Sequence, residues 1–445
     1  MNMNKIYLKK LLIIAVPLML SNVISQLQMI IDRIFLGQMN TYYMSALGNV
    51  TSPMWTTMSF CFSLSMGASI LISQNVGAND LEHIEEYSAS LVKWSNVIPT
   101  ILCFFWIFLG GFVYKTMGAA DSIMPYCVGY TRYYALCFLL VGVESSFMVI
   151  MQTSNYTKPM VWYGIIRAGS NVILDWILIF GRFGFPQMGI EGAAIATTIA
   201  ELLGCAFSFL IVTNNPRVNT KPSWSSVIKA PLKPFVESAR LGINPALEDF
   251  AWNLGNLVLI RILNSIDDLA AGIYSIVFSI EVLIVVIVGA LGNGVMTLCG
   301  EATGAKNVKQ YKNVCIIAYS LCVVLTLIVL GICLAIPEQI LSLFTKDQQI
   351  ITTCGIYLAL VCLNFFGKSG NIIIGSGIRG YGDTKWMFYT QIFGTVLVIC
   401  CGCFFVYVCH FGIIGVFLAV IVDEACRALI NLGRFIYITK RWQVM

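Results

Sequence analysis

Three polar residues inside apolar segments have the types and the spacing of an ion-binding group. Asp32 lies toward the end of a long apolar run, while Asn171 and Asp175 in NVILD are four residues apart and share one face of a helix. Two carboxylates that meet where water is scarce cannot both stay ionised cheaply, so such a pair takes up a proton. Alternatively, it binds Na⁺, a hard cation that prefers oxygen ligands. The hydroxyl of Thr197 or Thr198 would add another oxygen.

These residues belong to a larger set of acids in apolar segments. An acid in the middle of a spanning helix costs of order 2.5–3.5 kcal/mol on insertion scales, so each is a candidate for function. The set comprises Asp32, Glu144, Asp175, Glu201, Glu248, Asp249, Glu281, Asp423 and Glu424.

Ion pairing is the competing role for several of these acids. For Asp32 the alternative partner is Arg167, which lies two turns before Asp175 in sequence. Glu201 and Glu424 occupy equivalent places in a repeat described below, and we expect both to form structural ion pairs.

Two further acids are candidates for a substrate cavity. Glu248 follows Pro245, a residue that frees backbone carbonyls inside a helix. An ion pair with Lys368 or Arg261 is the alternative for Glu248 and for its neighbour Asp249. Glu281, in the next apolar run, is the other candidate.

The composition identifies the setting of these residues as a membrane. The chain has 445 residues, of which 58% are hydrophobic and only 11% are charged, and its mean hydropathy is +0.82. Soluble proteins average about 25% charged residues, so a water-soluble enzyme is excluded. With two histidines and no cysteine spacing typical of zinc, we expect no cofactor beyond a coupling ion.

The apolar runs predict twelve spanning helices, because each needs about 20 apolar residues. The predicted spans are 11–37, 51–76, 94–114, 126–151, 161–181, 190–213, 239–263, 269–299, 313–335, 351–378, 387–409 and 413–437. With the N-terminus inside, the inner segments hold 18 Lys and Arg and the outer loops hold 3. This asymmetry predicts an inner-membrane protein with both termini in the cytoplasm.

An internal repeat divides the spans into two sets of six. MGASILISQNVGAND at 66–80 resembles NGVMTLCGEATGAKN at 293–307, and NYTKPM and GIEGAA have later counterparts in the same order. We therefore predict an all-α integral membrane protein with a lobe at 1–213, a cytoplasmic linker at 214–238 and a lobe at 239–445. Six spans per copy imply a pseudo-twofold axis along the membrane normal, an arrangement that suits alternating access.

The stretch IIIGSGIRGYGDTK at 372–385 contains two patterns with other meanings. G-x-G-x-x-G is typical of dinucleotide-binding turns, but no β-α-β unit surrounds it. G-x-G-D, which ends here at Asp383, is a pattern found around one catalytic aspartate of some intramembrane proteases. Such an aspartate would lie deep in a span, but Thr384 and Lys385 follow Asp383 at once. We expect a glycine-rich tight turn.

The motifs taken together resemble the multidrug and toxic compound extrusion (MATE) family of cation-coupled antiporters, and within it the DinF-like prokaryotic branch. They are AVPLMLSNVISQLQMIIDRIFLGQ with Pro17 and Asp32, ILISQNVGAND, SNVILDWILIFGRFGFPQMGIEGAAIATTIAE, TGAKN and RGYGDTK. The resemblance covers the whole chain in family order.

The resemblance implies a monomeric exporter of organic, cationic or amphiphilic compounds, driven by inward H⁺ or Na⁺. It places the ion site in the N-terminal lobe, at Asp32, Asn171, Asp175 and Thr197, with Pro17 as a hinge. Other branches of the family carry one acid in span 7 and another in span 10. At the first of these positions this chain has Asn253, which we regard as a candidate cavity residue, and at the second it has Lys368 and Ser369.

Three other functions are weighed against export. A lipid-linked oligosaccharide flippase of the same superfamily would carry more bases in its cavity, whereas here nine acids in spans exceed six bases. An intramembrane aspartyl protease would use Asp383, and a channel is less consistent with a duplicated two-lobed chain. The composition indicates lipid and small organic molecules as partners, and no nucleic acid.

Overall fold

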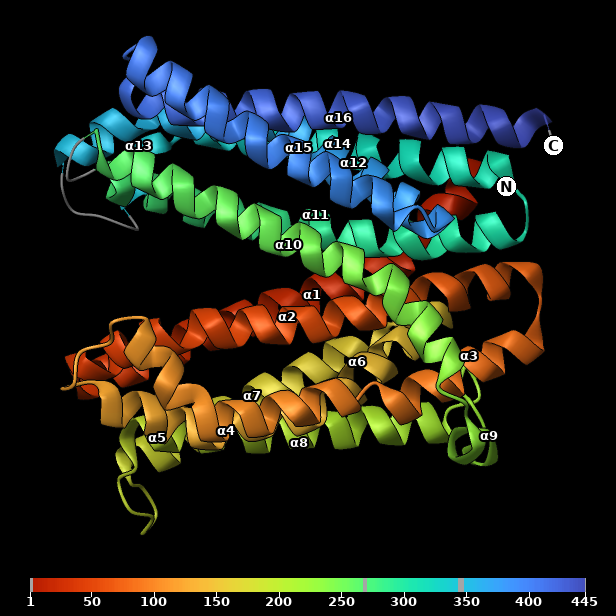
Figure 1. The fold of residues 1–445 in the computed structure, drawn as a ribbon, viewed down its shortest axis with the longest axis horizontal. Helices are drawn as coiled ribbons and strands as arrows, with labels where there is room; N and C mark the ends of the chain where they lie inside the picture. The colour runs from red at the N-terminus through yellow and green to blue at the C-terminus, as the bar shows by residue number, and fades with distance from the viewer. Residues whose placement is uncertain (1–2, 267–269, 343–347, 445) are drawn as a thin grey trace. The chain divides into compact units, whose positions relative to one another are not determined.

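The computed structural model describes residues 3–266, 270–342 and 348–444, and the regular structure in these ranges is entirely helical (Figure 1). In chain order the helices are α1 (Met3–Met39), α2 (Thr41–Ala78), α3 (Leu81–Trp94), α4 (Val97–Thr116), α5 (Met124–Tyr134), the 3₁₀ turn η1 (Ala135–Cys137), α6 (Phe138–Thr153), α7 (Lys158–Phe180), α8 (Gly189–Asn214), α9 (Trp224–Lys229), α10 (Lys233–Asn264), α11 (Ala270–Gly304), α12 (Val308–Ala335), α13 (Pro337–Ser342), α14 (Gln348–Tyr381), α15 (Thr384–Cys403), the π-helical turn η2 (Phe404–Val408) and α16 (Gly412–Val444).

Ten helical segments among the described residues are long and apolar enough to cross a membrane. Three of them join consecutive elements, because α3 leads into α4, α5 leads through η1 into α6, and α15 leads into η2. The other two long helices, α10 and α16, carry six charged side chains each and do not belong to this set. The prediction of an all-helical membrane protein is confirmed, although α2 begins at Thr41, ten residues before its predicted start.

Polar side chains and glycine fix the ends of several helices. The side chain of Asn40 caps α2 by accepting a hydrogen bond from the Tyr42 backbone N–H at 2.9 Å. Asp80 caps α3 in the same way, and the hydrogen bond from the His83 backbone lowers the pKa of Asp80 below its usual value. Gly181, with a φ of 67°, ends α7 in the left-handed conformation that glycine adopts freely.

By its contacts the chain forms two compact units. The first unit is Val16–Ile243, and the second combines Met1–Ala15 with Asn244–Met445. The division falls inside α1 beside Pro17 and inside α10 beside Pro245. Each unit therefore contains the first turns of a helix whose remainder belongs to the other unit. The lobes at 1–213 and 239–445 were predicted from chain order, and their boundaries stay a prediction.

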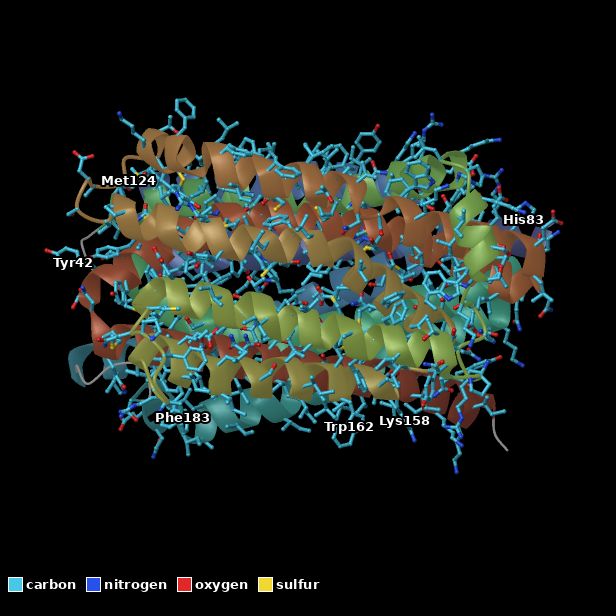
Figure 2. All side chains as sticks on the ribbon, turned by 90° about the horizontal axis from the view of Figure 1, so that it is seen from below. Tyr42, His83, Met124, Lys158, Trp162 and Phe183 are labelled. Atoms are coloured by element: carbon cyan, nitrogen blue, oxygen red, sulfur yellow. The ribbon has the colours of Figure 1, made fainter. Side chains whose placement is uncertain are left out.

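The loops of the first unit lie at its two opposite ends (Figure 2). Tyr42, Met124 and Phe183 mark one end, and His83 and Lys158 mark the other. α1 and α7 both run toward the end marked by Tyr42 and Phe183, so these two helices are parallel.

The glycine-rich segment 372–385 is mostly helical, so the prediction of a tight turn is wrong. α14 continues through it, and only Gly382, with a φ of 100°, and Asp383 form the turn before α15. Gly380 instead permits close helix packing, because a Cβ there would lie 2.5 Å from the Met296 carbonyl oxygen of α11. Glycines that serve turns and glycines that serve helix contacts look alike in a sequence.

Candidate functional site

The structure brings Asp32 of α1 and Asp175 of α7 together inside the first unit. Their carboxyl groups lie within hydrogen-bonding distance of each other, and Gln28, one turn before Asp32, bonds to Asp32 as well. The side chain of Asp175 is fully buried and that of Asp32 is half-buried. Two acids that are 143 residues apart in sequence thus share one water-poor site.

Asn171 links this pair to α8. With its amide nitrogen facing the acids, Asn171 donates to Asp32 Oδ1 at 2.9 Å and to Asp175 Oδ2 at 3.2 Å. Its amide oxygen then accepts from the Thr197 hydroxyl at 3.3 Å. The single hydrogen of this hydroxyl is also within reach of the Ala193 carbonyl oxygen of its own helix, at 2.9 Å, so the two acceptors share it. The four residues predicted as the coupling site therefore lie in one connected group, and their role in coupling stays a prediction.

A close contact between α1 and α7 explains why these residues meet. A Cβ at Gly164 would lie 2.9 Å from Ser21 Oγ and 3.3 Å from Ser21 Cα, so the helices approach closely there. Gln28 and Asp32 follow Ser21 by seven and eleven residues. Asn171 and Asp175 follow Gly164 by the same intervals. Because parallel helices rise equally per residue, one contact places both later pairs side by side.

Two tyrosines of α5 complete the surroundings of the acids. Tyr130 is buried and faces the charges of both Asp32 and Asp175, and Tyr134 stacks on Tyr130 with ring centroids 5.3 Å apart. Sequence analysis missed both residues, because tyrosines in GYTRYYA are indistinguishable from those of an interfacial belt.

Arg167 does not pair with Asp32, which was the alternative for this acid. Its guanidinium instead contacts Glu201 Oε2 at 3.2 Å and donates to the Ser25 hydroxyl at 2.6 Å. Among the described residues, no ion pair joins Arg167 to Asp32 or Asp175. Glu201 has the structural ion pair that the sequence predicted.

In the second unit, Glu248 forms an ion pair with Arg379 of α14. Its predicted alternative partners, Lys368 and Arg261, are therefore wrong. The prediction failed because Arg379 was assigned to a loop, whereas α14 continues far enough to carry it inside. Asn253 is exposed and donates to the Asp249 carbonyl oxygen at 2.7 Å.

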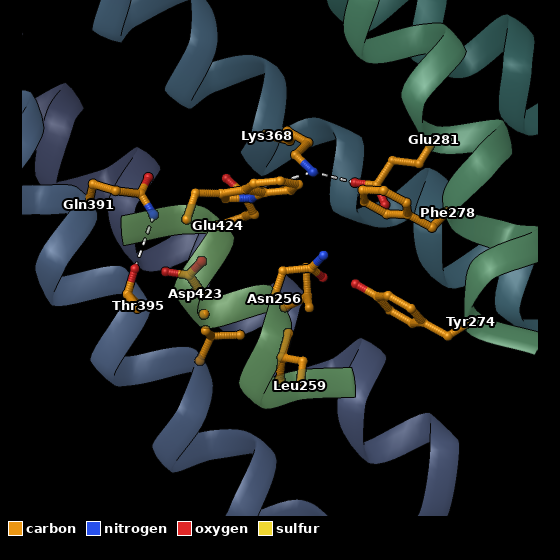
Figure 3. A pocket seen from close by; sticks show the side chains of 14 residues that line it. Asn256, Leu259, Tyr274, Phe278, Glu281, Lys368, Gln391, Thr395, Asp423 and Glu424 are labelled. Carbon is orange, nitrogen blue, oxygen red and sulfur yellow. Dashed lines mark hydrogen bonds and ion pairs between the residues drawn. The ribbon is translucent and has the colours of Figure 1, made fainter. Parts of the chain in front are cut away.

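Glu281 belongs to a cluster of charges beside a small cavity of the second unit (Figure 3). Lys368 bonds to Glu281 and lies 3.8 Å from Glu424, which is also 3.0 Å from Arg427. The rings of Tyr274 and neighbouring aromatics form another part of the wall. At about 40 Å³ the cavity has room for a few water molecules, whereas sites for organic ligands measure several hundred Å³. Glu281 lines the cavity, and Glu248 and Asn253 do not.

Two other predicted residues have plain structural surroundings. Pro17 lies within α1, which continues without a break from Met3 to Met39. Asp383 accepts two hydrogen bonds from the Arg434 guanidinium, at 2.8 and 2.6 Å. This ion pair accounts for Asp383 without proteolytic chemistry.

Comparisons with known proteins agree with this architecture. A family model described as MatE matches residues 17–177 and 246–404. The "Probable multidrug resistance protein NorM" of Thermotoga maritima is 25% identical, covering 98% of this chain and 93% of its own. The "FAD transporter" of Shewanella oneidensis is 22% identical, covering 77% and 75%.

A solved structure described as MATE in the bent conformation matches with a TM-score of 0.90 at 16% identity, over 98% of this chain and 96% of that chain. A second, described as MATE in the straight conformation, matches with a TM-score of 0.88 over 98% and 97%. The likeness confirms the predicted fold of twelve membrane helices in two sets of six.

Proposed function

Because this chain belongs to the MatE family, we propose that it is an antiporter that exports organic cations in exchange for inward H⁺ or Na⁺. The observation that carries this proposal is the hydrogen-bonded pair of the half-buried Asp32 and the buried Asp175. A hydrogen bond between two carboxyl groups contains one proton, so the arrangement favours H⁺ as the ligand. Na⁺ is the alternative; Asn171 would then turn its amide oxygen toward the aspartates, and Thr197 would add a hydroxyl oxygen.

In this mechanism the ion and the cargo compete for the same negative charge. An ion that enters from outside neutralises the aspartates, which removes the attraction for a cationic cargo and favours its release outward. Pro17 weakens the hydrogen-bond ladder of α1, so α1 is the helix we expect to bend between the two states. Related proteins of the same fold have been solved in bent and straight conformations, which supports two such states.

The charges of the chain support a cationic cargo over an anionic one. The buried bases of the membrane helices are engaged by acids, since Arg167 pairs with Glu201, Lys368 with Glu281 and Glu424, Arg379 with Glu248, and Arg427 with Asp423. Bases held in this way are poorly placed to bind the phosphates of a lipid-linked sugar. The relative described as a FAD transporter makes a flavin the appropriate anionic test cargo.

The distribution of Lys and Arg supports an inner-membrane location with both termini in the cytoplasm. We place the end of the first unit that carries His83 and Lys158 in the cytoplasm (Figure 2). The Asp32 and Asp175 pair then lies in the half of the membrane that faces outward.

Transport by the purified protein in liposomes tests the proposal. Ethidium movement is recorded under a pH gradient alone and under a Na⁺ gradient alone, with FAD as the anionic comparison. We expect Asp32→Asn and Asp175→Asn each to reduce gradient-driven ethidium transport at least about tenfold. One charge-assisted contact is worth about 1.5–3 kcal/mol, and 1.4 kcal/mol corresponds to a factor of ten.

The matched control is Asp121→Asn, which makes the same change at an exposed loop position and should transport like the wild type. Wild-type transport in either Asp32→Asn or Asp175→Asn would remove the proposed site. Transport of FAD in place of ethidium would overturn the cationic cargo, and transport under the Na⁺ gradient alone would make Na⁺ the coupling ion.

A further inference from the structure

A tyrosine hydroxyl in the first unit stands between two carboxyl groups. The Tyr163 hydroxyl of α7 lies 2.6 Å from Glu144 Oε1 of α6 and 2.6 Å from Glu201 Oε1 of α8. Tyr163 and Glu201 are buried, and Glu144 is half-buried. These acids are separate from Asp32 and Asp175 and have no part in the mechanism above.

The hydrogens available for these two contacts can be counted. A tyrosine hydroxyl has one hydrogen, and two contacts of 2.6 Å are each as short as a strong O–H···O bond. The second hydrogen must therefore come from one of the acids. Arg167 lies 3.2 Å from Glu201 Oε2 and stabilises the ionised form of Glu201. The proton therefore belongs on Glu144, which donates to Tyr163 while Tyr163 donates to Glu201.

We propose that Glu144 is a proton-binding site distinct from the aspartate pair, and that its proton controls the hold of Arg167 on α1. The ligand is H⁺ itself, which converts the Glu144 carboxylate to a carboxylic acid.

The helices α2, α3, α4 and α8 and the turn η1 pack against α6. From α2, Ser65 bonds to Ser145, and from the junction of α3 and α4, Ser95 bonds to Ser146; both contacts are made by uncharged hydroxyls. The titratable and charged groups that face Glu144 are Tyr163 and Arg167 of α7, Glu201 and Cys205 of α8, and Cys137 of η1. Arg167 is the one positive charge in this set.

The connection to α1 is made by the second guanidinium nitrogen of Arg167, the one that does not contact Glu201. Arg167 donates to the Ser25 hydroxyl of α1 at 2.6 Å, and Ser25 lies seven residues before Asp32, on the same face of the helix. When Glu144 loses its proton, two carboxylates compete for one guanidinium. Arg167 then turns toward Glu144 and releases Ser25. The proton on Glu144 thus keeps α1 attached to α7.

Infrared difference spectroscopy of the purified protein tests the protonation directly. A change of pH should produce a carbonyl band of a protonated carboxyl group. To isolate Glu144, the measurement uses the Asp32→Asn/Asp175→Asn background, which removes the aspartate pair. We expect the band to persist in this background and to disappear when Glu144→Gln is added. Glu82→Gln, an exposed acid of α3, should leave the band unchanged.

Thermal unfolding gives a second readout, because glutamine has the size and polarity of a protonated glutamate. Glu144→Gln should leave the apparent Tm within about two degrees of wild type, whereas Glu201→Gln should lower it by more, since it leaves Arg167 without a carboxylate. A band that survives Glu144→Gln would overturn the proposal. So would the reverse order of the two Tm shifts, which would put the proton on Glu201.

The part that this effect on α1 plays in transport rests on the proposed function, while the protonation of Glu144 and the response of α1 do not. With a spin label on α1 at Asn22, an exposed position, protonation should reduce the mobility of the label in wild type but not in Glu144→Gln. Equal pH responses in both proteins would overturn the link to α1. Failure of ethidium transport in the wild type would overturn the proposed function and leave the infrared result unaffected.

Discussion

The stability of each buried charge in this protein depends on the oppositely charged groups that contact it. In the second unit, Lys368 bonds to Glu281 and lies near Glu424, while Arg427 holds both Glu424 and Asp423. Removing a charge from water costs several kcal/mol, and the partner offsets this cost only while it stays in place. Glu281 depends on Lys368, whereas Glu424 has a second cation. Loss of Lys368 should therefore destabilise Glu281 more than Glu424.

Replacing Lys368 tests the dependence of Glu281 on this cation. Lys368→Met leaves Glu281 without its cation, so we expect a loss of about 3–5 kcal/mol in stability and a lower apparent Tm in thermal unfolding. Adding Glu281→Gln should restore most of the loss, because it removes the stranded charge. Lys385→Met, an exposed lysine of α15, is the matched control and should have little effect. A double variant no more stable than Lys368→Met would contradict the pairing.

At the scale of helices, the candidate site depends on the contact between α1 and α7. Gly164 permits that contact, and the equal intervals from Ser21 and Gly164 then bring Asp32 opposite Asp175. A side chain at Gly164 pushes the helices apart at the start of this series. The site therefore senses a change at a position two to three turns away.

Gly164→Ala should weaken ion binding without touching any acid. Its Cβ would lie 2.9 Å from Ser21 Oγ, so we expect a several-fold higher ion concentration for half-maximal ethidium transport, in line with a strain of about 1–3 kcal/mol. Ser21→Gly in the same protein should recover part of the loss. Gly169→Ala, on the same helix with open space around it, should behave like the wild type. If Gly169→Ala were as harmful, the effect would belong to α7 in general.

Sequence patterns captured what is local and missed what depends on packing. Hydropathy located the spanning helices, and the four-residue interval placed Asn171 and Asp175 on one face. The contacts of Tyr163 with Glu144 and Glu201 were missed, because they join three helices that no local pattern relates. Charge pairing failed for the same reason at Arg379. Arg379 reaches Glu248 because α14 continues through the glycine-rich segment, which the sequence analysis had assigned to a turn.

At the scale of the whole chain, the repeat is symmetric in its framework and asymmetric in its chemistry. The first turns of α1 pack on α11 in the second unit, where a Cβ at Gly294 would lie 3.0 Å from Leu11 Cδ1. The first turns of α10 pack on α2 in the first unit, where Gly67 meets Gly242. Gly67 and Gly294 are equivalent in the repeat. The position equivalent to Asp32 is Ile260, so the aspartate pair exists in one copy only.

The contact between α2 and α10 brings backbone atoms of the two helices close together, which leads to the last prediction. A Cβ at Gly67 would lie 1.9 Å from the Ser238 oxygen, and one at Gly242 would lie 2.4 Å from the Ser63 oxygen. Gly67→Ala and Gly242→Ala should each lower the apparent Tm, because two backbones must separate to admit a methyl group, at a cost of at least about 1–3 kcal/mol.

The matched control is Gly48→Ala, on the same helix as Gly67 but with open space around it. Alanine favours a helix over glycine by about 0.5–1 kcal/mol, so Gly48→Ala should keep or raise the Tm. The contrast isolates the exchanged first turns of α10 as the cause, since the same chemical change has opposite signs at two positions of α2. Equal Tm shifts at Gly48 and Gly67 would show that the start of α10 does not hold the first unit together.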